Sequence, residues 1–184
     1  MSIGMKVYQK RAMRTSPRDG HDKIYNGILG LIGETGELVD ILKKYKFQSG
    51  MDAQLPKLQI AEKLGDVLWY LAELADGMEV DLIDIAGDDF SIIERKMRRK
   101  SLRKPPLDNA ILELSDRAAR IRRSVKRHNI SDTHAHMRAM LKLIAHVARF
   151  TGYSITGIAE MNINKLQKRY PKGFDPEISK GRYE

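Results

Sequence analysis

Apolar residues recur every three or four positions over most of the 184-residue chain, and this spacing constrains the fold more than any other feature. Residues spaced in this way share one face of an α-helix, so the pattern predicts amphipathic helices. No stretch shows the alternation of apolar and polar residues that is typical of a half-buried β-strand. The sequence therefore predicts an all-α protein that folds as a helical bundle.

Proline, glycine and capping residues divide this pattern into separate helices. Pro56 suits a first helical turn, Asp81 is expected to cap a helix, and Ser131 or Asp132 is expected to cap another. The tail after residue 169 is rich in turn residues and is expected to be extended. The predicted helices span about residues 3–13, 20–44, 56–76, 81–101, 107–127, 132–150 and 154–169.

The last three predicted helices resemble a degenerate copy of the second, third and fourth predicted helices. A shift of 83 residues pairs "NGILGL" with "NAILEL", and a shift of 73 pairs Leu68 with Leu141 and "IAGDDF" with "IAEMNI". Amphipathic helices can align this well by chance, so duplication and coincidence both stay open. Duplication would divide the chain into residues 1–104 and a degenerate second repeat at 105–184, packed as one globular unit.

The composition excludes some classes of site and directs attention to one segment. The chain has no cysteine, which excludes disulfides and thiolate metal sites and makes the cytoplasm the expected location. No apolar run is long enough to cross a membrane. The net charge of +9 is concentrated in residues 95–127, which hold thirteen Lys and Arg against three acids. This segment could bind nucleic acid through phosphate contacts, steer anionic substrates or contact an acidic partner.

Two pairs of acidic residues lie in otherwise apolar helical sequence. Glu34 and Glu37 are three positions apart, and Glu62 and Asp66 are four apart on the next helix, so each pair shares a face. If the two helices pack antiparallel, as their short loop favours, the four carboxylates converge. Oxygen ligands of this kind suit Mg²⁺ or Mn²⁺, whose charge would offset their repulsion. The alternative is a solvated acidic face.

Glycines interrupt the first of these helices at a regular step. Gly30, Gly33 and Gly36 each cost roughly 1 kcal/mol relative to alanine in a helix. A helix without side chains at these positions lets a neighbouring helix or a ligand come close to its backbone. We therefore expect a tight approach along this face, and the alternative is that the glycines mark a kink.

Three blocks of the sequence, "NGILGLIGETGELVDILKKYKFQ", "EKLGDVLWYLAELA" and "IAEMNINKLQKRYPKGF", together resemble the MazG-like proteins of the all-α nucleoside triphosphate pyrophosphohydrolase superfamily, particularly the short phage forms. The resemblance covers about residues 8–100 and 152–182. It implies an enzyme that uses Mg²⁺, or Mn²⁺, to cleave an NTP or dNTP to the monophosphate and pyrophosphate. It also implies a homodimer, unless the internal copy replaces the partner subunit.

The resemblance assigns catalytic and metal-binding roles residue by residue. The E-x-x-E pattern of the family matches Glu34 and Glu37, and the last residue of its E-x-x-D pattern matches Asp66. An acid is expected at position 63, where this chain has Lys63 preceded by Glu62. Either Glu62 reaches in from the adjacent position, or one metal position is lost and Lys63 places an ammonium group near the phosphates. The predicted catalytic and metal-binding set is therefore Glu34, Glu37, Glu62 and Asp66.

Other residues are expected to bind the substrate. Lys165 and Arg169, one helical turn apart, are candidates to hold pyrophosphate, and Trp69 could stack on a base. The family resemblance supports Asn162 and Lys165. Because Lys63 departs from the family pattern, the alternative is an impaired relative that binds nucleotide, or nucleic acid through its basic helices, without hydrolysis. The predicted substrate-binding set is Asn26, Lys43, Lys63, Trp69, Tyr70, Asn162, Lys165 and Arg169.

Overall fold

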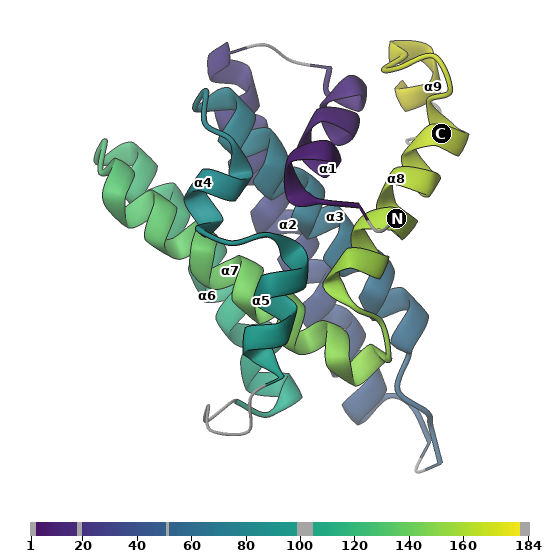
Figure 1. Cartoon of the computed structure of the whole chain (residues 1–184). Coiled ribbons are helices and arrows are strands. Elements are labelled where there is room, and N and C mark those ends of the chain that lie inside the picture. The colour runs from purple at the N-terminus through teal and green to yellow at the C-terminus, as the bar shows by residue number, and fades with distance from the viewer. Residues whose placement is uncertain (1–2, 18–19, 51, 99–104, 181–184) are drawn as a thin grey trace.

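The computed structural model describes residues 3–17, 20–50, 52–98 and 105–180 (Figure 1). All regular structure in these ranges is helical, which confirms the predicted all-α class. None of the helices in the described ranges combines the length and hydrophobicity that crossing a bilayer requires. The elements in chain order are α1 (Met5–Ala12), the 3-10 turn η1 (Met13–Thr15), α2 (Gly20–Phe47), α3 (Lys57–Gly77), α4 (Leu82–Ala86), α5 (Phe90–Met97), α6 (Leu107–Lys126), α7 (Ile130–Thr151), α8 (Ile155–Arg169) and α9 (Pro176–Lys180).

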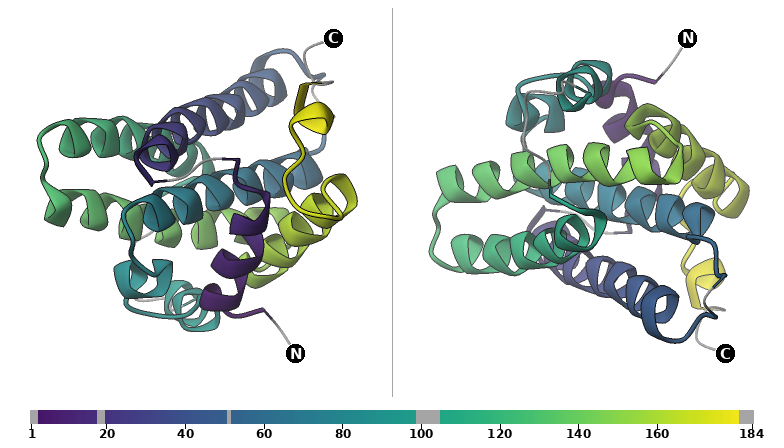
Figure 2. Two further views of the ribbon diagram at one scale, coloured as in Figure 1. Left: turned by 90° about the horizontal axis from the view of Figure 1, so that it is seen from above. Right: turned by 90° about the horizontal axis from the view of Figure 1, so that it is seen from below.

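Four long helices form the centre of the molecule. The α2 helix packs along α3 and α6 packs along α7, while α2 also contacts α6 and α3 contacts α7. The short helices α4 and α5 pack on α7, and α1 and α8 pack on α3. The tip of the α6–α7 hairpin and the α8–α9 segment lie at opposite ends of the molecule (Figure 2). Fully buried side chains that fill the space between the long helices include Leu31, Leu38, Leu64, Leu68, Leu71, Ile121, Met140 and Ile144.

The α6–α7 hairpin packs against the α2–α3 hairpin. Each helix of the second hairpin contacts its counterpart in the first, α6 with α2 and α7 with α3. Two unrelated hairpins can pack in the same way, so the duplication and the division into residues 1–104 and 105–184 stay predictions. The expected homodimer also stays a prediction.

The structure corrects the single helix predicted for residues 81–101. Gly87 ends α4 with a φ of 74°, a left-handed conformation that glycine adopts without strain. Asp89 then starts α5, and its side chain accepts a hydrogen bond from the backbone N–H of Phe90. The helix is therefore divided into α4 and α5, and its predicted end near Ser101 lies outside the described residues.

Two other local predictions were wrong. The side chain of Asn129, rather than Ser131 or Asp132, caps α7 by accepting a hydrogen bond from the N–H of Asp132 at 3.0 Å. The tail is not extended throughout, because α9 forms after the turn around Gly173. In both regions a local side-chain or backbone contact decided where the helix begins.

Glycines allow α3 to approach the first half of α2. A Cβ atom added to Gly27 would lie 3.0 Å from Leu74 Cβ and 3.1 Å from Leu74 N, and one added to Gly30 would overlap the ring of Tyr70. A Cβ atom added to Gly33 or Gly36 would meet nothing within 4 Å. The expected close approach of a neighbouring helix therefore occurs at Gly27 and Gly30, whereas Gly33 and Gly36 are exposed.

This difference predicts opposite effects of two alanine substitutions in one helix. Gly27→Ala forces α2 away from the α3 backbone and should lower the free energy of unfolding by about 1–3 kcal/mol. Gly33→Ala, which meets no neighbour, should raise it by up to about 1 kcal/mol through helix propensity. Urea denaturation followed by circular dichroism measures both, and equal effects of the two substitutions would contradict the packing described here.

Candidate active site

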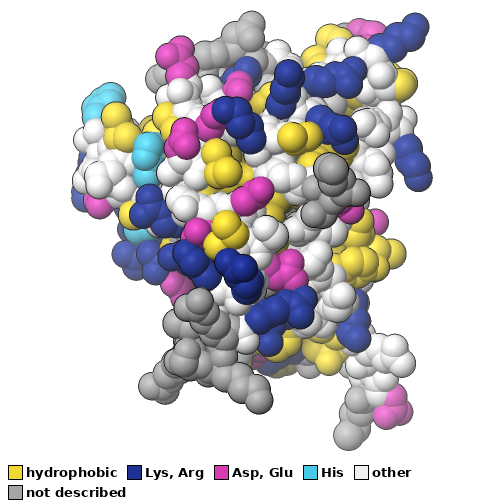
Figure 3. Space-filling view, viewed as in Figure 1, with side chains coloured by type: hydrophobic (Ala, Val, Ile, Leu, Met, Phe, Trp, Pro, Cys, Tyr) yellow, Lys and Arg dark blue, Asp and Glu magenta, His cyan; other side chains and the backbone are white. Residues whose placement is uncertain are grey.

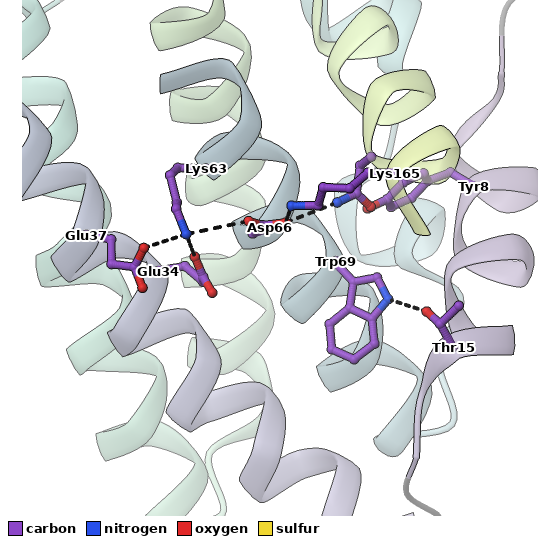
Figure 4. Close-up of polar contacts among 9 residues, drawn as sticks. Tyr8, Thr15, Glu34, Glu37, Lys63, Asp66, Trp69 and Lys165 are labelled. Atoms are coloured by element: carbon purple, nitrogen blue, oxygen red, sulfur yellow. Dashed lines mark hydrogen bonds and ion pairs between the residues drawn. The ribbon is translucent and has the colours of Figure 1, made fainter. Parts of the chain in front are cut away.

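Packing of α2 on α3 brings three carboxylates around one ammonium group (Figure 4). Glu34 and Glu37 share a face of α2, and Lys63 and Asp66 share a face of α3, because each pair is three positions apart. The Nζ atom of Lys63 lies 3.0 Å from Glu34 Oε2 and 3.7 Å from Asp66 Oδ2, and it also pairs with Glu37. We call these four residues the carboxylate–ammonium centre.

The charges of this centre depend on one another. Burial raises the pKa of Glu34, although the hydrogen bond from Lys63 opposes this shift. Burial lowers the pKa of Lys63, but the hydrogen bonds that Lys63 donates to Glu37 and Glu34, together with the charge of Asp66, outweigh this effect and raise the pKa well above its usual value. Lys63 is therefore a permanent cation between the carboxylates at neutral pH.

Asp66 is also held by two other helices. It pairs with Lys165 of α8, and Asn162 Nδ2 of the same helix lies 3.4 Å from Asp66 Oδ1. The hydroxyl of Tyr8, in α1, donates a 2.9 Å hydrogen bond to Asn162 Oδ1. A Cβ atom added to Gly65 would lie 3.1 Å from Asn162 Cβ, so this glycine allows α8 to approach α3.

A cavity of about 610 Å³ lies beside the centre. The rings of Trp69 and Tyr70 meet edge to face there at 4.8 Å, and Trp69 Nε1 donates a 3.1 Å hydrogen bond to Thr15 Oγ1. The guanidinium of Arg169 lies 4.9 Å from the centre of the Tyr170 ring. The cavity thus combines aromatic surface with carboxylates and cations, and its lining includes Asn26, Glu34, Asp66, Trp69, Tyr70, Lys165, Arg169, Tyr170 and Phe174.

A smaller hollow of about 370 Å³ adjoins the centre at Lys63 and Glu37. Glu62 is exposed and lines this hollow, together with Asp40, Lys44 and Gln59. Members of the carboxylate–ammonium centre line both openings, so the centre separates the larger cavity from the smaller hollow.

The predicted catalytic residues are distributed over these two openings. The structure brings Glu34, Glu37 and Asp66 together around Lys63 and places Glu62 in the adjoining hollow. The sequence left open whether Glu62 or Lys63 turns inward. In the structure the ammonium group of Lys63 is turned toward the carboxylates. The metal-binding role of all four acids stays a prediction.

Most of the predicted substrate-binding residues lie around the cavity. Asn26, Trp69, Tyr70, Lys165 and Arg169 line it. Asn162 is buried behind Asp66, whereas Lys43 is exposed, pairs with Asp40 and is not among the described residues that line the cavity.

Sequence reasoning missed several residues that support this site. Glu73 is fully buried, where it accepts hydrogen bonds from Asn26 Nδ2 at 2.6 Å and Ser16 Oγ at 2.8 Å. An acid within the apolar run "WYLAELA" was the signal that could have identified it. No signal in the sequence pointed to Tyr8 or Phe174, because their roles come from contacts with distant segments.

The carboxylates of the centre are of the type that binds divalent cations, but Lys63 lies among them. Within the described residues, no group of three or more His, Asp or Glu side chains is arranged so that it could hold a metal ion. Carboxylate oxygens from Glu34, Glu37 and Asp66 are nevertheless the ligands that Mg²⁺ and Mn²⁺ prefer, and the Lys63 ammonium shows that a cation is stable among them. A metal ion could use these oxygens only if Lys63 moved.

The basic segment at 95–127 is only partly described, because Arg99, Lys100, Arg103 and Lys104 lie outside the described residues. In α6, Arg117 pairs with Glu113 and Arg120 with Asp116. Lys and Arg side chains also gather over α5 and the adjoining part of α7 (Figure 3). Nucleic-acid binding by this segment stays a prediction. The exposed basic residues toward the α6–α7 tip are Arg122, Arg123, Lys126 and Arg127.

The burial of Tyr8 predicts its behaviour at alkaline pH. Burial, together with the nearby charge of Asp66, raises its pKa well above 10.0. We expect Tyr8→Phe to leave the tyrosinate absorbance of the folded protein unchanged in an alkaline titration, because Tyr8 stays protonated. Tyr25→Phe, which removes an exposed ring, should lower that absorbance.

The same shift predicts how stability changes with pH. Because folded Tyr8 binds its proton more tightly than unfolded Tyr8, its contribution to stability is complete below pH 10.0 and is lost as the pH rises further. Tyr8→Phe should reduce that loss, as measured by urea denaturation. Equal absorbance losses in Tyr8→Phe and Tyr25→Phe would contradict a buried, protonated Tyr8.

Comparisons with known proteins relate the segment that contains this centre to one protein family. Residues 25–102 match the model of the MazG nucleotide pyrophosphohydrolase domain, and this range contains the whole carboxylate–ammonium centre. The Gene 37 protein of Mycobacterium phage L5 is 31% identical over 72 residues, which are 39% of this chain and 63% of that protein. No solved structure matches the chain. The resemblance predicted from the sequence is therefore confirmed for this part of the chain: residues 25–102 are similar to the MazG nucleotide pyrophosphohydrolase domain.

Proposed function

We propose that this protein binds a nucleoside triphosphate in the cavity and hydrolyses it between the α and β phosphates, releasing a nucleoside monophosphate and pyrophosphate. The match to the MazG domain supports the class of reaction. The observation that carries the proposal is the convergence of Glu34, Glu37 and Asp66 on one point beside a cavity that also holds cationic and aromatic side chains.

The cavity offers separate groups for the parts of a nucleotide. Its volume of about 610 Å³ is within the usual range for small-molecule sites. Trp69 and Tyr70 provide ring surface for the base, and Lys165 and Arg169, one turn apart on α8, provide cations for the phosphates. This division assigns the base to the α3 wall and the phosphates to the space between α3 and α8.

The carboxylates would act on the attacking water and on the phosphates. Glu34 lines the cavity, so its carboxylate can reach an attacking water there and accept a proton from it. We therefore assign the role of general base to Glu34 rather than to the more exposed Glu37. A divalent cation bound by Glu34, Glu37 and Asp66 would supply positive charge for the phosphate oxygens.

Removing the proposed base tests this function directly. Glu34→Gln keeps the shape of the side chain and should slow pyrophosphate release by about 100-fold or more. The measurement is pyrophosphate release from a panel of NTPs and dNTPs with Mg²⁺ or Mn²⁺. Glu113→Gln, on α6, is the control and should retain wild-type rates. Release that is no faster in the wild-type protein than in Glu34→Gln would refute the proposal.

A second candidate function is nucleotide binding without hydrolysis, and the position of Lys63 favours it. The ammonium group lies where a cation would contact all three carboxylates, so it could exclude the metal ion permanently. Under this alternative the wild-type protein is inert but binds nucleotide, and Lys63→Glu, which restores the acid of the family pattern, gains turnover. Turnover by the wild-type protein would exclude it.

Nucleotide binding can be followed separately from hydrolysis. Trp69 is the single tryptophan of the chain and lines the cavity, so we expect its fluorescence to change when a non-hydrolysable triphosphate analogue binds. Arg169→Met should weaken this binding by about tenfold, the usual effect of losing a charge-assisted hydrogen bond. Lys168→Met removes an exposed cation from the same helix and should leave affinity unchanged. Equal affinities of the two variants would place the phosphates elsewhere.

A further inference from the structure

Lys63 is held by its surroundings more firmly than an ordinary surface lysine. Its side chain is 26% exposed, and those of Glu34 and Asp66 are 17% and 18% exposed. Charges in such positions are less screened by water than those of exposed ion pairs. The three carboxylates around Lys63 come from two helices, so the ammonium group also offsets the repulsion that would otherwise act between α2 and α3.

A divalent cation and the Lys63 ammonium group need the same carboxylate oxygens. The donor atoms that Lys63 contacts on Glu34, Glu37 and Asp66 are the ones that a metal ion would use. Two cations among these oxygens would repel each other at short range. Binding of the metal ion therefore requires Lys63 to leave the carboxylates.

Lys63 lines the smaller hollow and contacts two residues, Glu34 and Asp66, that line the cavity. Its flexible four-carbon stem starts on α3 at the boundary between the cavity and the smaller hollow. A triphosphate in the cavity would bring oxygen acceptors close to Glu34 and Asp66, which line both the cavity and the surroundings of Lys63. Phosphate oxygens could then replace the carboxylates as the partners of the ammonium group.

We propose that Lys63 is an intramolecular competitor of the divalent cation and that nucleotide phosphates displace it. This inference rests on the proposed function for the identity of the nucleotide site. It has two consequences: the protein without nucleotide binds Mg²⁺ or Mn²⁺ weakly, and nucleotide and cation strengthen each other's binding because one removes the obstacle to the other.

Manganese binding without nucleotide is the first test. Electron paramagnetic resonance measures free Mn²⁺ during a titration of the wild-type protein and of Lys63→Met, which keeps the stem and removes the charge. We expect Lys63→Met to bind Mn²⁺ at least about tenfold more tightly, because a cation no longer has to be displaced. Lys46→Met removes an ammonium group from the Lys46–Asp108 pair in the last turn of α2 and should bind Mn²⁺ like the wild type.

The second test measures coupling between the two ligands. A non-hydrolysable triphosphate analogue should strengthen Mn²⁺ binding more in the wild-type protein than in Lys63→Met. Because the analogue also binds Mn²⁺ in solution, only the difference between the two proteins reports on Lys63. Equal strengthening, or Mn²⁺ binding by Lys63→Met that is no tighter than in the wild type, would overturn the inference.

If Lys63→Met folds poorly, the thermal stability of a second variant tests the same inference. Lys63→Gln retains a polar group, and its melting temperature should rise on addition of Mn²⁺ by more than that of the wild type. An equal rise in the two proteins would overturn the inference. These results are independent of hydrolysis. Tighter Mn²⁺ binding by Lys63→Met supports the inference even when the wild-type protein shows no hydrolysis and the proposed function fails. An active wild type with unchanged Mn²⁺ affinity in the variants refutes only the inference.

Discussion

Close packing between α2 and α3 is the constraint on which the rest of this structure depends. The two helices meet where glycine replaces larger side chains, at Gly27 against Leu74 and at Gly30 against Tyr70. This contact fixes the rotation of each helix, so that Glu34 and Glu37, one to two turns further along α2, face α3. The glycines lower helix propensity, and the structure offsets this cost with the interhelical contacts that they permit.

The carboxylates that face each other between α2 and α3 repel one another, and two lysine side chains offset this repulsion. Lys63 contacts Glu34, Glu37 and Asp66, and Lys165 contacts Asp66 from the other side. Three carboxylates and two ammonium groups leave a formal charge of −1. The ammonium groups offset the repulsion between the acidic residues, and Lys63 lies at the point where we propose that a divalent cation competes with it.

The sequence predicted the parts of the site that depend on helical periodicity. Glu34, Glu37 and Asp66 were placed together because positions three or four apart share a face and consecutive helices pack against each other. Whether Glu62 or Lys63 turns inward could not be predicted, because adjacent positions differ by about 100° around a helix and both fitted the pattern. The rotation of α3 on α2 decided it.

Other features depended on contacts between segments far apart in the chain. Tyr8 lies 154 residues before Asn162, and its hydroxyl became a support for Asp66 only when α1 and α8 packed on α3. Buried Glu73 lies in an apolar run. Its partners, Asn26 and Ser16, come from earlier elements, so its role depends on contacts between segments far apart in the chain. The break at Gly87 was missed for a different reason, since a glycine inside a helical pattern is often tolerated.

The participation of α8 has a consequence for how the protein is made. Lys165 follows its partner Asp66 by 99 residues. While the ribosome is still translating, α2 and α3 can pair and bring their carboxylates together, but Lys165 and Arg169 have yet to be added. The α8 side of the cavity, where we propose that the phosphates bind, therefore forms after the α2–α3 side, and a nascent or truncated chain that ends with the family-matched segment would lack it.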